Sequence, residues 1–91
     1  MLRVVAYDIA SPKRLRKVAL ACLDFGIRIE KSVFECDLAD DEFEELWKQL
    51  CAIAEEEVDA LVCYPICAAC EQRISTFGPA RHLEPCECRV L

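Results

Sequence analysis

The chain has 91 residues, of which 55% are hydrophobic and 31% are charged, and only two are glycine. This composition excludes a linker or a disordered tail, and the length allows one compact domain but not two. No stretch approaches the roughly 20 apolar residues of a membrane span, and the first residues lack the pattern of a secretory signal, so we expect a cytoplasmic protein that contacts no membrane.

The net charge of −6 is unevenly distributed along the chain. Residues 1–34 carry seven Lys or Arg against three acids, whereas residues 35–91 carry four against fourteen. The total argues against nucleic-acid binding, but the asymmetry indicates a polyanionic partner or a partner protein with a basic face. The alternative is an ordinary solvated helix surface.

Residues 1–8 read MLRVVAYD, an almost unbroken apolar strand that ends on one carboxylate, Asp8. We expect this strand to be buried on both faces, where an unpaired ion costs several kcal/mol. Asp8 therefore predicts either a metal site or a cap for the turn or helix that follows.

A helix is expected from Ser11-Pro12 to about Phe25, because Ser caps free amides, Pro suits the first helical position and apolar residues recur at helical spacing. Gly26 is expected to be its C-cap. Cations in the first turns of a helix oppose its dipole, so helix stability does not explain their placement, and this favours contact with phosphate over placement for stability alone. These cations are Lys13, Arg14, Arg16 and Lys17.

The segment from residue 27 to 38 alternates apolar and polar residues with a change of phase near Lys31-Ser32, which predicts a bulge or two short strands. A second helix is expected to open at Asp40-Asp41 and to end within residues 55–57. Its expected buried apolar stripe consists of Phe43, Leu46, Trp47, Leu50, Ile53 and Ala54. Residues 60–66, ALVCYPI, are expected to form a central strand, and residues 73–77 a further short strand.

This order of elements predicts an α+β fold, a ferredoxin-like βαββαβ sandwich over residues 1–78 with an extra short C-terminal strand. Both helices would cover one face of the sheet, and a two-fold partner, making a homodimer, is the simplest cover for the other. Residues 79–91 are expected to be a tail or arm that packs on the other protomer or on a larger partner, with a disordered terminus as the alternative.

Four short motifs together resemble one family: YDI at residues 7–9, KRLRKV at residues 13–18, Gly26 before Arg28, and SVF at residues 32–34. In this combination the chain is similar to CRISPR-associated protein 2, the small subunit of the machinery that captures foreign DNA as new spacers. The resemblance covers roughly residues 1–78. It implies a homodimer of ferredoxin-like protomers, with metal-dependent nuclease activity in some members and a non-catalytic role bridging two integrase dimers in others.

The resemblance also suggests which residues serve activity or the nucleic-acid surface. Arg and Lys would hold phosphates without reading bases, so binding should tolerate any sequence and weaken with salt. Tyr7 and Phe34, with Ser32, are assigned a supporting role, and aromatic residues at such positions are more often core than contact. The expected nucleic-acid contacts are Lys13, Arg14, Arg16, Lys17, Arg28 and Lys31.

Asp8 is the candidate catalytic and metal-binding residue. One carboxylate is a poor site for Mg²⁺ or Mn²⁺, whereas two Asp8 side chains across a dimer axis would supply a second. They would repel each other unless a cation lay between them, so metal binding should fail in acid. The alternative is that Asp8 caps the following turn or helix.

Eight cysteines need a separate explanation. Cys22, Cys51 and Cys63 fall on apolar positions, where Cys behaves as a small hydrophobe, and Cys36 lies in β structure without an evident partner. Two closely spaced pairs remain, separated by fifteen residues, and they suit zinc or a disulfide, although the second pair lacks the usual spacing. These pairs are Cys67 with Cys70 and Cys86 with Cys88.

Three functions follow from this sequence. We favour a dimeric adaptor that binds duplex DNA and bridges subunits of a CRISPR-associated integrase. The second is a metal-dependent endonuclease that cuts RNA or DNA through paired Asp8 residues, and the third is a ferredoxin-like, zinc-binding interaction module.

Overall fold

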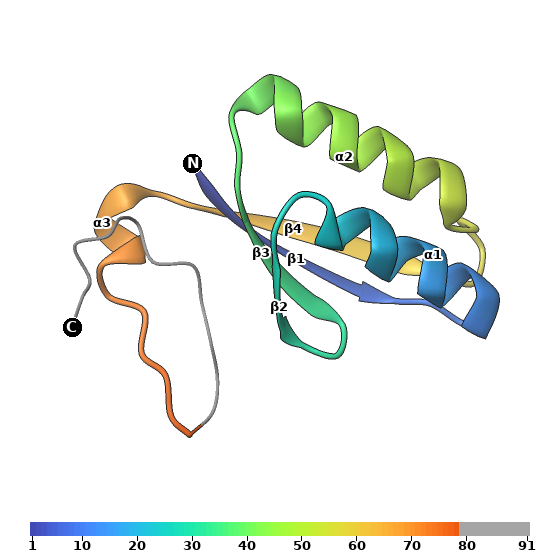
Figure 1. The fold of residues 1–91 in the computed structure, drawn as a ribbon, viewed down its shortest axis with the longest axis horizontal. Coiled ribbons are helices and arrows are strands. Elements are labelled where there is room, and N and C mark those ends of the chain that lie inside the picture. The colour runs from blue at the N-terminus through green and yellow to red at the C-terminus, as the bar shows by residue number, and fades with distance from the viewer. Residues whose placement is uncertain (79–91) are drawn as a thin grey trace.

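The computed structural model describes residues 1–78 and contains four strands and three helices in that part of the chain. The short helix α3 follows the last strand (Figure 1). The elements in chain order are β1 (Leu2–Asp8), α1 (Pro12–Leu23), β2 (Ile27–Glu30), β3 (Val33–Asp37), α2 (Asp40–Ile53), β4 (Ala60–Ile66) and α3 (Ala68–Glu71).

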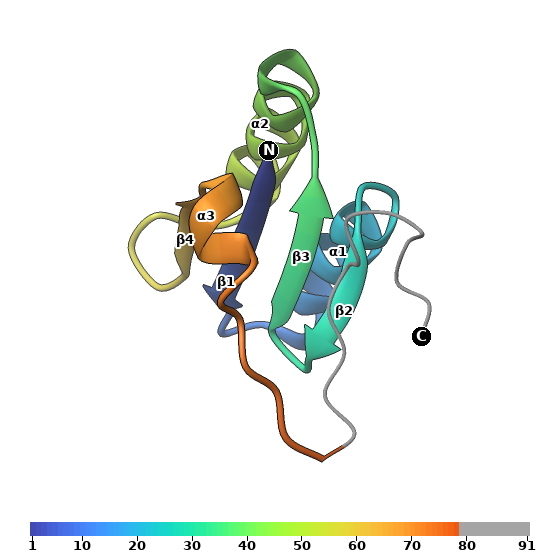
Figure 2. The same cartoon turned by 90° about the vertical axis from the view of Figure 1, so that its left-hand side faces the viewer.

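The strands form one antiparallel sheet in the order β2-β3-β1-β4, with α1 and α2 packed over one face (Figures 1 and 2). The first strand thus lies in the middle, between β3 and β4. This is the strand order of a ferredoxin-like α+β sandwich, so the predicted fold class is confirmed. The phase change near Lys31-Ser32 proves to be a hairpin turn between β2 and β3, with an additional register shift between Arg28 and Glu30.

The hydrophobic core lies between the sheet and the two helices. Leu46 and Leu50 of α2 are fully buried, as the predicted apolar stripe requires, and the partly buried Phe43, Trp47 and Ile53 pack against them. Each fully buried side chain of this size contributes roughly 1.5 to 3 kcal/mol of stability. From the sheet and α1 the core includes Val5, Tyr7, Val18, Cys22, Phe34 and Cys36.

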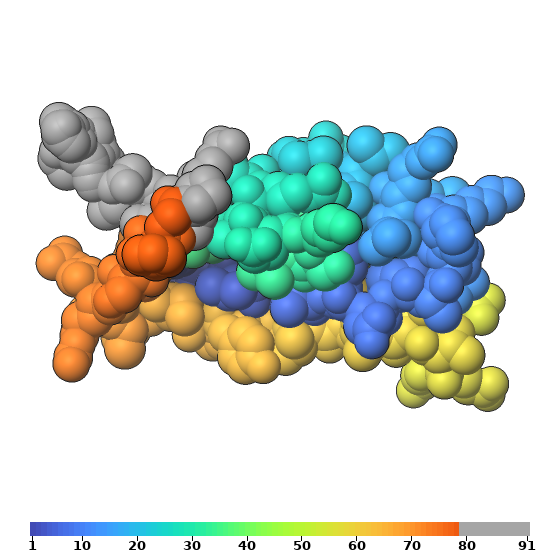
Figure 3. All heavy atoms as spheres, turned by 90° about the horizontal axis from the view of Figure 1, so that it is seen from below, coloured from blue at the N-terminus to red at the C-terminus, as the bar shows by residue number. Residues whose placement is uncertain are grey.

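The first strand is buried on its helix-covered face and only partly buried on the other, so the expectation that both faces are buried was only partly right. Val5 and Tyr7 point into the core, whereas on the other face Leu2 is 1% exposed, Val4 and Ala6 are half-buried and Asp8 is exposed. The helices α1 and α2 pack on the opposite face of the sheet, and Figure 3 shows this second face from below. We call it the open sheet face.

The expected central strand at residues 60–66 is an edge strand of this sheet. It pairs only with β1 among the described strands, and Pro65, which has no N–H to donate, is compatible with an edge position. Residues 73–77 form no strand, because no neighbouring strand of the described chain pairs with them, and Phe77 is 96% exposed.

Two helix ends also differ from the prediction. The first helix ends at Leu23 with Asp24 as its C-cap, so Gly26 does not serve as the cap. The second helix ends at Ile53, because residues 55–59 form a turn in which the Asp59 carboxylate accepts the Glu55 backbone N–H at 2.8 Å.

Gly26 is required for a different reason, the close approach of β3. A Cβ atom at this position would lie 2.2 Å from the Glu35 carbonyl oxygen and 2.7 Å from the Cys36 Sγ atom. Any side chain would therefore push the β3 backbone away.

Within residues 1–78, no helix is long and apolar enough to cross a membrane. The predicted arm at residues 79–91, including His82, Cys86 and Cys88, lies outside the described residues.

Candidate nucleic-acid and metal site

Asp8 ends β1 on the open sheet face, beside the first residue of β4. The register pairs Asp8 with Ala60, and the two residues line a hollow of about 230 Å³ together with Ala6 and Val62. Because the Asp8 side chain is exposed, water solvates its charge and no buried partner is needed. The carboxylate is therefore free to accept a cation from solvent.

A single chain supplies only part of a metal site at this position. Within residues 1–78, no group of three or more His, Cys, Asp or Glu side chains is arranged to hold a metal ion. Mg²⁺ and Mn²⁺ take oxygen ligands, and Mg²⁺ usually keeps several waters on one or two carboxylates, so Asp8 fits as one ligand of such an ion. A second protein carboxylate would have to come from outside residues 1–78 of this chain, and a second copy is one such source.

Asp59 also lies near the end of β1, but its carboxylate is fully engaged. Its Oδ2 accepts from Arg14 Nε at 2.8 Å and its Oδ1 accepts from the Ala10 backbone N–H at 2.9 Å. The Arg14 guanidinium and the backbone donors hold the pKa of Asp59 far below its usual range, and the Asp59 side chain is 0% exposed. Asp59 therefore joins the β1–α1 loop to the α2–β4 loop and is not available to a metal.

Arg14 and Arg3 are consequently not free cations. Arg14 pairs with Asp59 and, at 3.7 Å, with Glu55. The buried Arg3 donates to the Leu38 carbonyl oxygen at 2.7 Å and pairs with Asp40 at 2.6 Å. Both belong to the seven basic residues of residues 1–34. In the structure, however, Arg3 contacts the β3–α2 loop and Arg14 contacts the α2–β4 loop.

The remaining cations of the first turns of α1 stay exposed. Lys13, Arg16 and Lys17 line a hollow of about 350 Å³ together with Pro12. Within residues 1–78, none of the three forms a salt bridge. These three residues are hereafter the basic face of α1.

Arg28 lies on the helix-covered side of β2, above the aromatic pair. Its guanidinium carbon is 5.4 Å from the Phe34 ring centroid, and its positive charge acts to lower the pKa of the nearby Tyr7. Burial nevertheless raises the pKa of Tyr7 overall. Since Asp8 faces the open side of the sheet, Arg28 and Asp8 lie on opposite faces.

The end of β1 is held in place by contacts of Tyr7, Ser32 and Phe34. The rings of Tyr7 and Phe34 stack with their centroids 6.1 Å apart, and both residues are buried, as expected of core aromatics. The Tyr7 backbone N–H donates to the Ser32 carbonyl oxygen at 3.1 Å, and its hydroxyl donates to the Lys31 carbonyl oxygen at 3.4 Å. These contacts fix the end of β1, and with it Asp8, against the β2–β3 turn, where the Lys31 side chain is exposed.

Cys67, the N-cap of α3, and Cys70, within α3, are exposed and form no disulfide with another cysteine of residues 1–78. The backbone N–H of Cys70, and then its thiol, lower the pKa of Cys67, which favours the thiolate that metals bind. Because Cys86 and Cys88 lie outside the described residues, the four-cysteine site stays a prediction. Burial raises the pKa of Cys22 to about 12 and that of Cys36 to about 11, so both are inert core residues.

The family model described as CRISPR associated protein Cas2 matches residues 1–74. Among curated proteins, the chain is 39% identical over 83 residues to "CRISPR-associated endoribonuclease Cas2 1" of Moorella thermoacetica, covering 86% of each chain. It is also 39% identical over 69 residues to "CRISPR-associated endonuclease Cas2" of Halalkalibacterium halodurans, covering 70% of this chain and 72% of that one.

Solved structures agree with this match. The crystal structure of Streptococcus pyogenes Cas2 superposes with a TM-score of 0.77 at 36% identity, covering 86% of this chain and all (100%) of that one. A hypothetical protein from Thermus thermophilus gives a TM-score of 0.79 at 31% identity, covering 88% and 93% of the two chains.

Proposed function

Because the chain belongs to the Cas2 family of CRISPR-associated proteins, we propose that it acts in spacer acquisition as a dimeric adaptor that binds duplex DNA and bridges integrase subunits. The observation that carries this proposal is the basic face of α1. Lys13, Arg16 and Lys17 are exposed on one helix and are left unpaired by the described chain, although it has an excess of acids.

The basic face is suited to phosphates and not to bases. Its three cations lie in the first six residues of α1, where the positive end of the helix dipole adds to their charge. Flexible Lys and Arg side chains on an exposed helix neutralise phosphates without fixed hydrogen bonds to base edges. Binding should therefore be independent of sequence, as capture of foreign DNA requires.

The open sheet face supports the dimer. Val62 and Tyr64 are 37% and 56% exposed there, beside the half-buried Val4 and Ala6. Apolar side chains that stay exposed on a sheet face are typical of a protein interface, and a two-fold partner would cover them with the same surface. The basic faces of the two copies would remain outside this interface and present about six cations to a duplex.

The second candidate is a metal-dependent endonuclease, favoured by the exposed carboxylate of Asp8 at the edge of the open sheet face and by the names of the relatives. In a dimer through this face, two Asp8 carboxylates would hold one Mg²⁺ or Mn²⁺ ion. Such an ion would polarise a phosphoryl oxygen and activate water. Each copy of the chain would contribute one Asp8 carboxylate and the Tyr7 contacts that position it.

The two functions are separated by one variant in two assays, a reconstituted integration reaction with the integrase subunit and a cleavage reaction with the purified protein. Asp8→Ala should leave integration of a duplex intact under the adaptor function, whereas metal-dependent cleavage of RNA or DNA should disappear under the nuclease function. Cleavage that persists in Asp8→Ala identifies a contaminating nuclease or another catalytic residue.

The adaptor function is tested directly by Lys13→Glu/Arg16→Glu, which should weaken duplex binding at least tenfold at low salt and abolish integration. The control Lys48→Glu/Arg73→Glu changes the net charge equally at exposed positions elsewhere. An equal loss in both variants would assign the effect to total charge and reject the basic face as the binding surface.

A further inference from the structure

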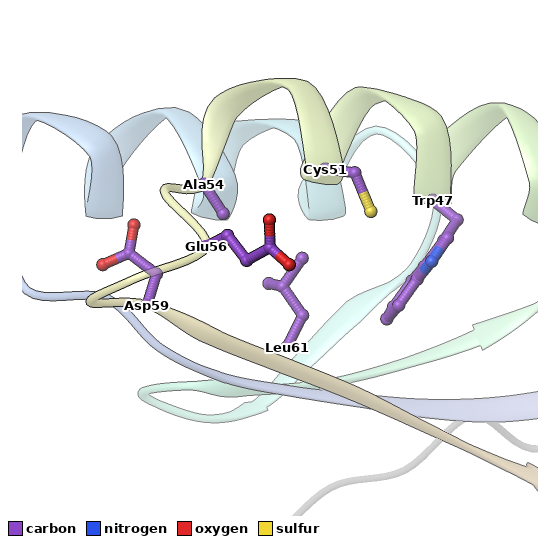
Figure 4. A pocket seen from close by; sticks show the side chains of 6 residues that line it. All are labelled: Trp47, Cys51, Ala54, Glu56, Asp59 and Leu61. Atoms are coloured by element: carbon purple, nitrogen blue, oxygen red, sulfur yellow. The ribbon is translucent and has the colours of Figure 1, made fainter.

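An apolar groove lies on the helix side of the molecule, between α2 and the edge strand β4. Figure 4 shows Trp47, Cys51 and Ala54 projecting from α2 toward Leu61 of β4. These residues line a hollow of about 340 Å³. A second hollow of about 460 Å³ runs along α2 past Phe43 and shares Trp47 and Cys51 with the first, so the two hollows adjoin each other and are together called the groove.

The floor of this groove has the features of a binding surface. The rings of Phe43 and Trp47 stack with their centroids 5.6 Å apart, and both side chains remain only partly buried. Trp is the residue most enriched among those that dominate the energy of protein interfaces, where a large ring fills a pocket and excludes water. A stacked aromatic pair beside an exposed Cys51 therefore offers an anchor for apolar side chains.

The rim of the groove is acidic. Asp41, Glu44 and Glu45 of α2 line it at one end and Glu56 lines it at the other, while Lys48 is the one cation among the residues that line the two hollows. Residues 40–59 contain nine acids and one Lys. Asp59 also lines the groove, but its carboxylate is neutralised by Arg14.

This charge decides which occupant fits. A nucleic acid carries the same sign as the rim and would be repelled. A second copy placed by two-fold symmetry would bring the same acids against each other, which is equally unfavourable. A positively charged protein segment fits, because Lys or Arg side chains would meet the rim while apolar side chains fill the floor.

We propose that the groove between α2 and β4 binds a cationic amphipathic segment of a partner protein, with its apolar side on Phe43, Trp47 and Leu61 and its Lys or Arg side chains on Glu44 and Glu45. This site is distinct from the basic face of α1 and from the open sheet face. It thus goes beyond the proposed adaptor function and does not depend on either surface.

Trp47 provides a direct readout, because it is the single tryptophan of the chain. We would titrate the full-length protein with a synthetic 18-residue peptide that carries Leu on one helical face and Lys on the other. A second peptide would replace every Lys by Glu. Burial of Trp47 should shift its emission to shorter wavelength with the Lys peptide, at an affinity at least tenfold higher than with the Glu peptide.

Glu44→Lys/Glu45→Lys should reduce the affinity for the Lys peptide at least tenfold, and Glu44→Gln/Glu45→Gln should give an intermediate loss. The matched control Asp24→Lys/Glu30→Lys makes the same charge change at exposed acids away from the groove and should bind within twofold of the wild type. All of these positions are exposed, and circular dichroism would verify folding.

Three results would overturn the proposal. Equal affinity for the two peptides would remove the role of the acidic rim, and an equal loss in the control would reduce the effect to total charge. An emission shift on dilution of the protein alone, or on addition of duplex DNA, would assign the groove to a second copy or to nucleic acid.

Discussion

The guanidinium of Arg14 lies against the carboxylate of Asp59 with two hydrogen bonds, Nε to Oδ2 at 2.8 Å and Nη2 to Oδ1 at 3.1 Å. Each carboxylate oxygen also accepts one backbone N–H. Oδ1 accepts from Ala10, and Oδ2 accepts from Glu55. Four donors on one carboxylate connect the start of α1, the end of β1 and the loop before β4. This contact fixes the loops on either side of Asp8.

Asp59→Asn should lower the stability of the protein toward urea at pH 7, because it removes a bidentate charged pair and leaves the Arg14 guanidinium half-buried without its main partner. The lowered pKa of Asp59 means that the folded state holds the ionised form more strongly than the unfolded chain does. The stabilisation is therefore complete above the ordinary Asp pKa of about 4 and is lost as the pH falls below it.

The measurement is the urea midpoint at pH 7 and at pH 3 for the wild type and for Asp59→Asn, with Glu30→Gln as an exposed-acid control. The difference between wild type and Asp59→Asn should shrink at pH 3, and the control should follow the wild type at both. A difference that is the same at both pH values would show that the ionised carboxylate is not what stabilises the loops.

Gly26→Ala should destabilise the protein by about 1 to 3 kcal/mol, the range for overpacking. The added Cβ would meet the Glu35 carbonyl oxygen at 2.2 Å, and this is a backbone atom of a paired strand that cannot move without disturbing the sheet. Gly78→Ala is the contrasting variant, because no atom of residues 1–78 lies within 4 Å of the position that its Cβ would take, while its φ of +75° opposes a side chain. Thermal unfolding of both variants is the measurement. A Gly26→Ala variant that melts at the wild-type temperature would contradict the steric explanation.

The elements were predictable from the sequence wherever the signal is local. The Ser11-Pro12 start of α1 and the apolar stripe of α2 depend on residues a few positions apart, and both are confirmed. The roles of Arg14 and Gly26 depend instead on partners that are distant or in another element. Arg14 pairs with Asp59, 45 residues away, and Gly26 lies against the backbone of β3. Nothing in KRLRKV distinguishes Arg14, which is paired, from Arg16, which forms no salt bridge within residues 1–78.

The position of a strand within the sheet was likewise not predictable from the sequence. The apolar run at residues 60–66 indicates a strand with two faces to bury, but the sequence does not say whether another strand or a second protein covers them. Within the described chain it lies at the edge. Asp8 was found because a charge that ends an apolar strand is a local signal, whereas Asp59 has no such signal in the residues around it.

Val62→Glu should convert the proposed dimer into a monomer. Val62 is on the open sheet face, 37% exposed, opposite Ala6 in the register, and a buried carboxylate without a partner at an interface would be strongly unfavourable. Val58→Glu is the matched control, since Val58 is 57% exposed in the loop before β4. Light scattering should give a single-chain mass for Val62→Glu and a two-chain mass for the wild type and the control; a dimeric Val62→Glu would place the interface elsewhere.

The shared metal site makes a prediction about stoichiometry. If two Asp8 carboxylates hold one ion across a dimer axis, Mn²⁺ titrated into the protein and followed by electron paramagnetic resonance should bind at one ion per two chains. Asp8→Asn should abolish this binding, and Asp37→Asn, at an exposed acid at the other end of the same sheet face, should leave it unchanged. Binding should also be lost in acid, because carboxylate ligands must be deprotonated.

The monomeric Val62→Glu variant extends this test, because it keeps Asp8 but separates the two copies. It should lose the Mn²⁺ site together with Asp8→Asn if the axis supplies the second carboxylate. One ion per chain in the wild type, or retention of the site in the monomer, would instead assign the metal to ligands within a single chain. In that case the pairing of Asp8 across the interface would be wrong even if the dimer itself formed.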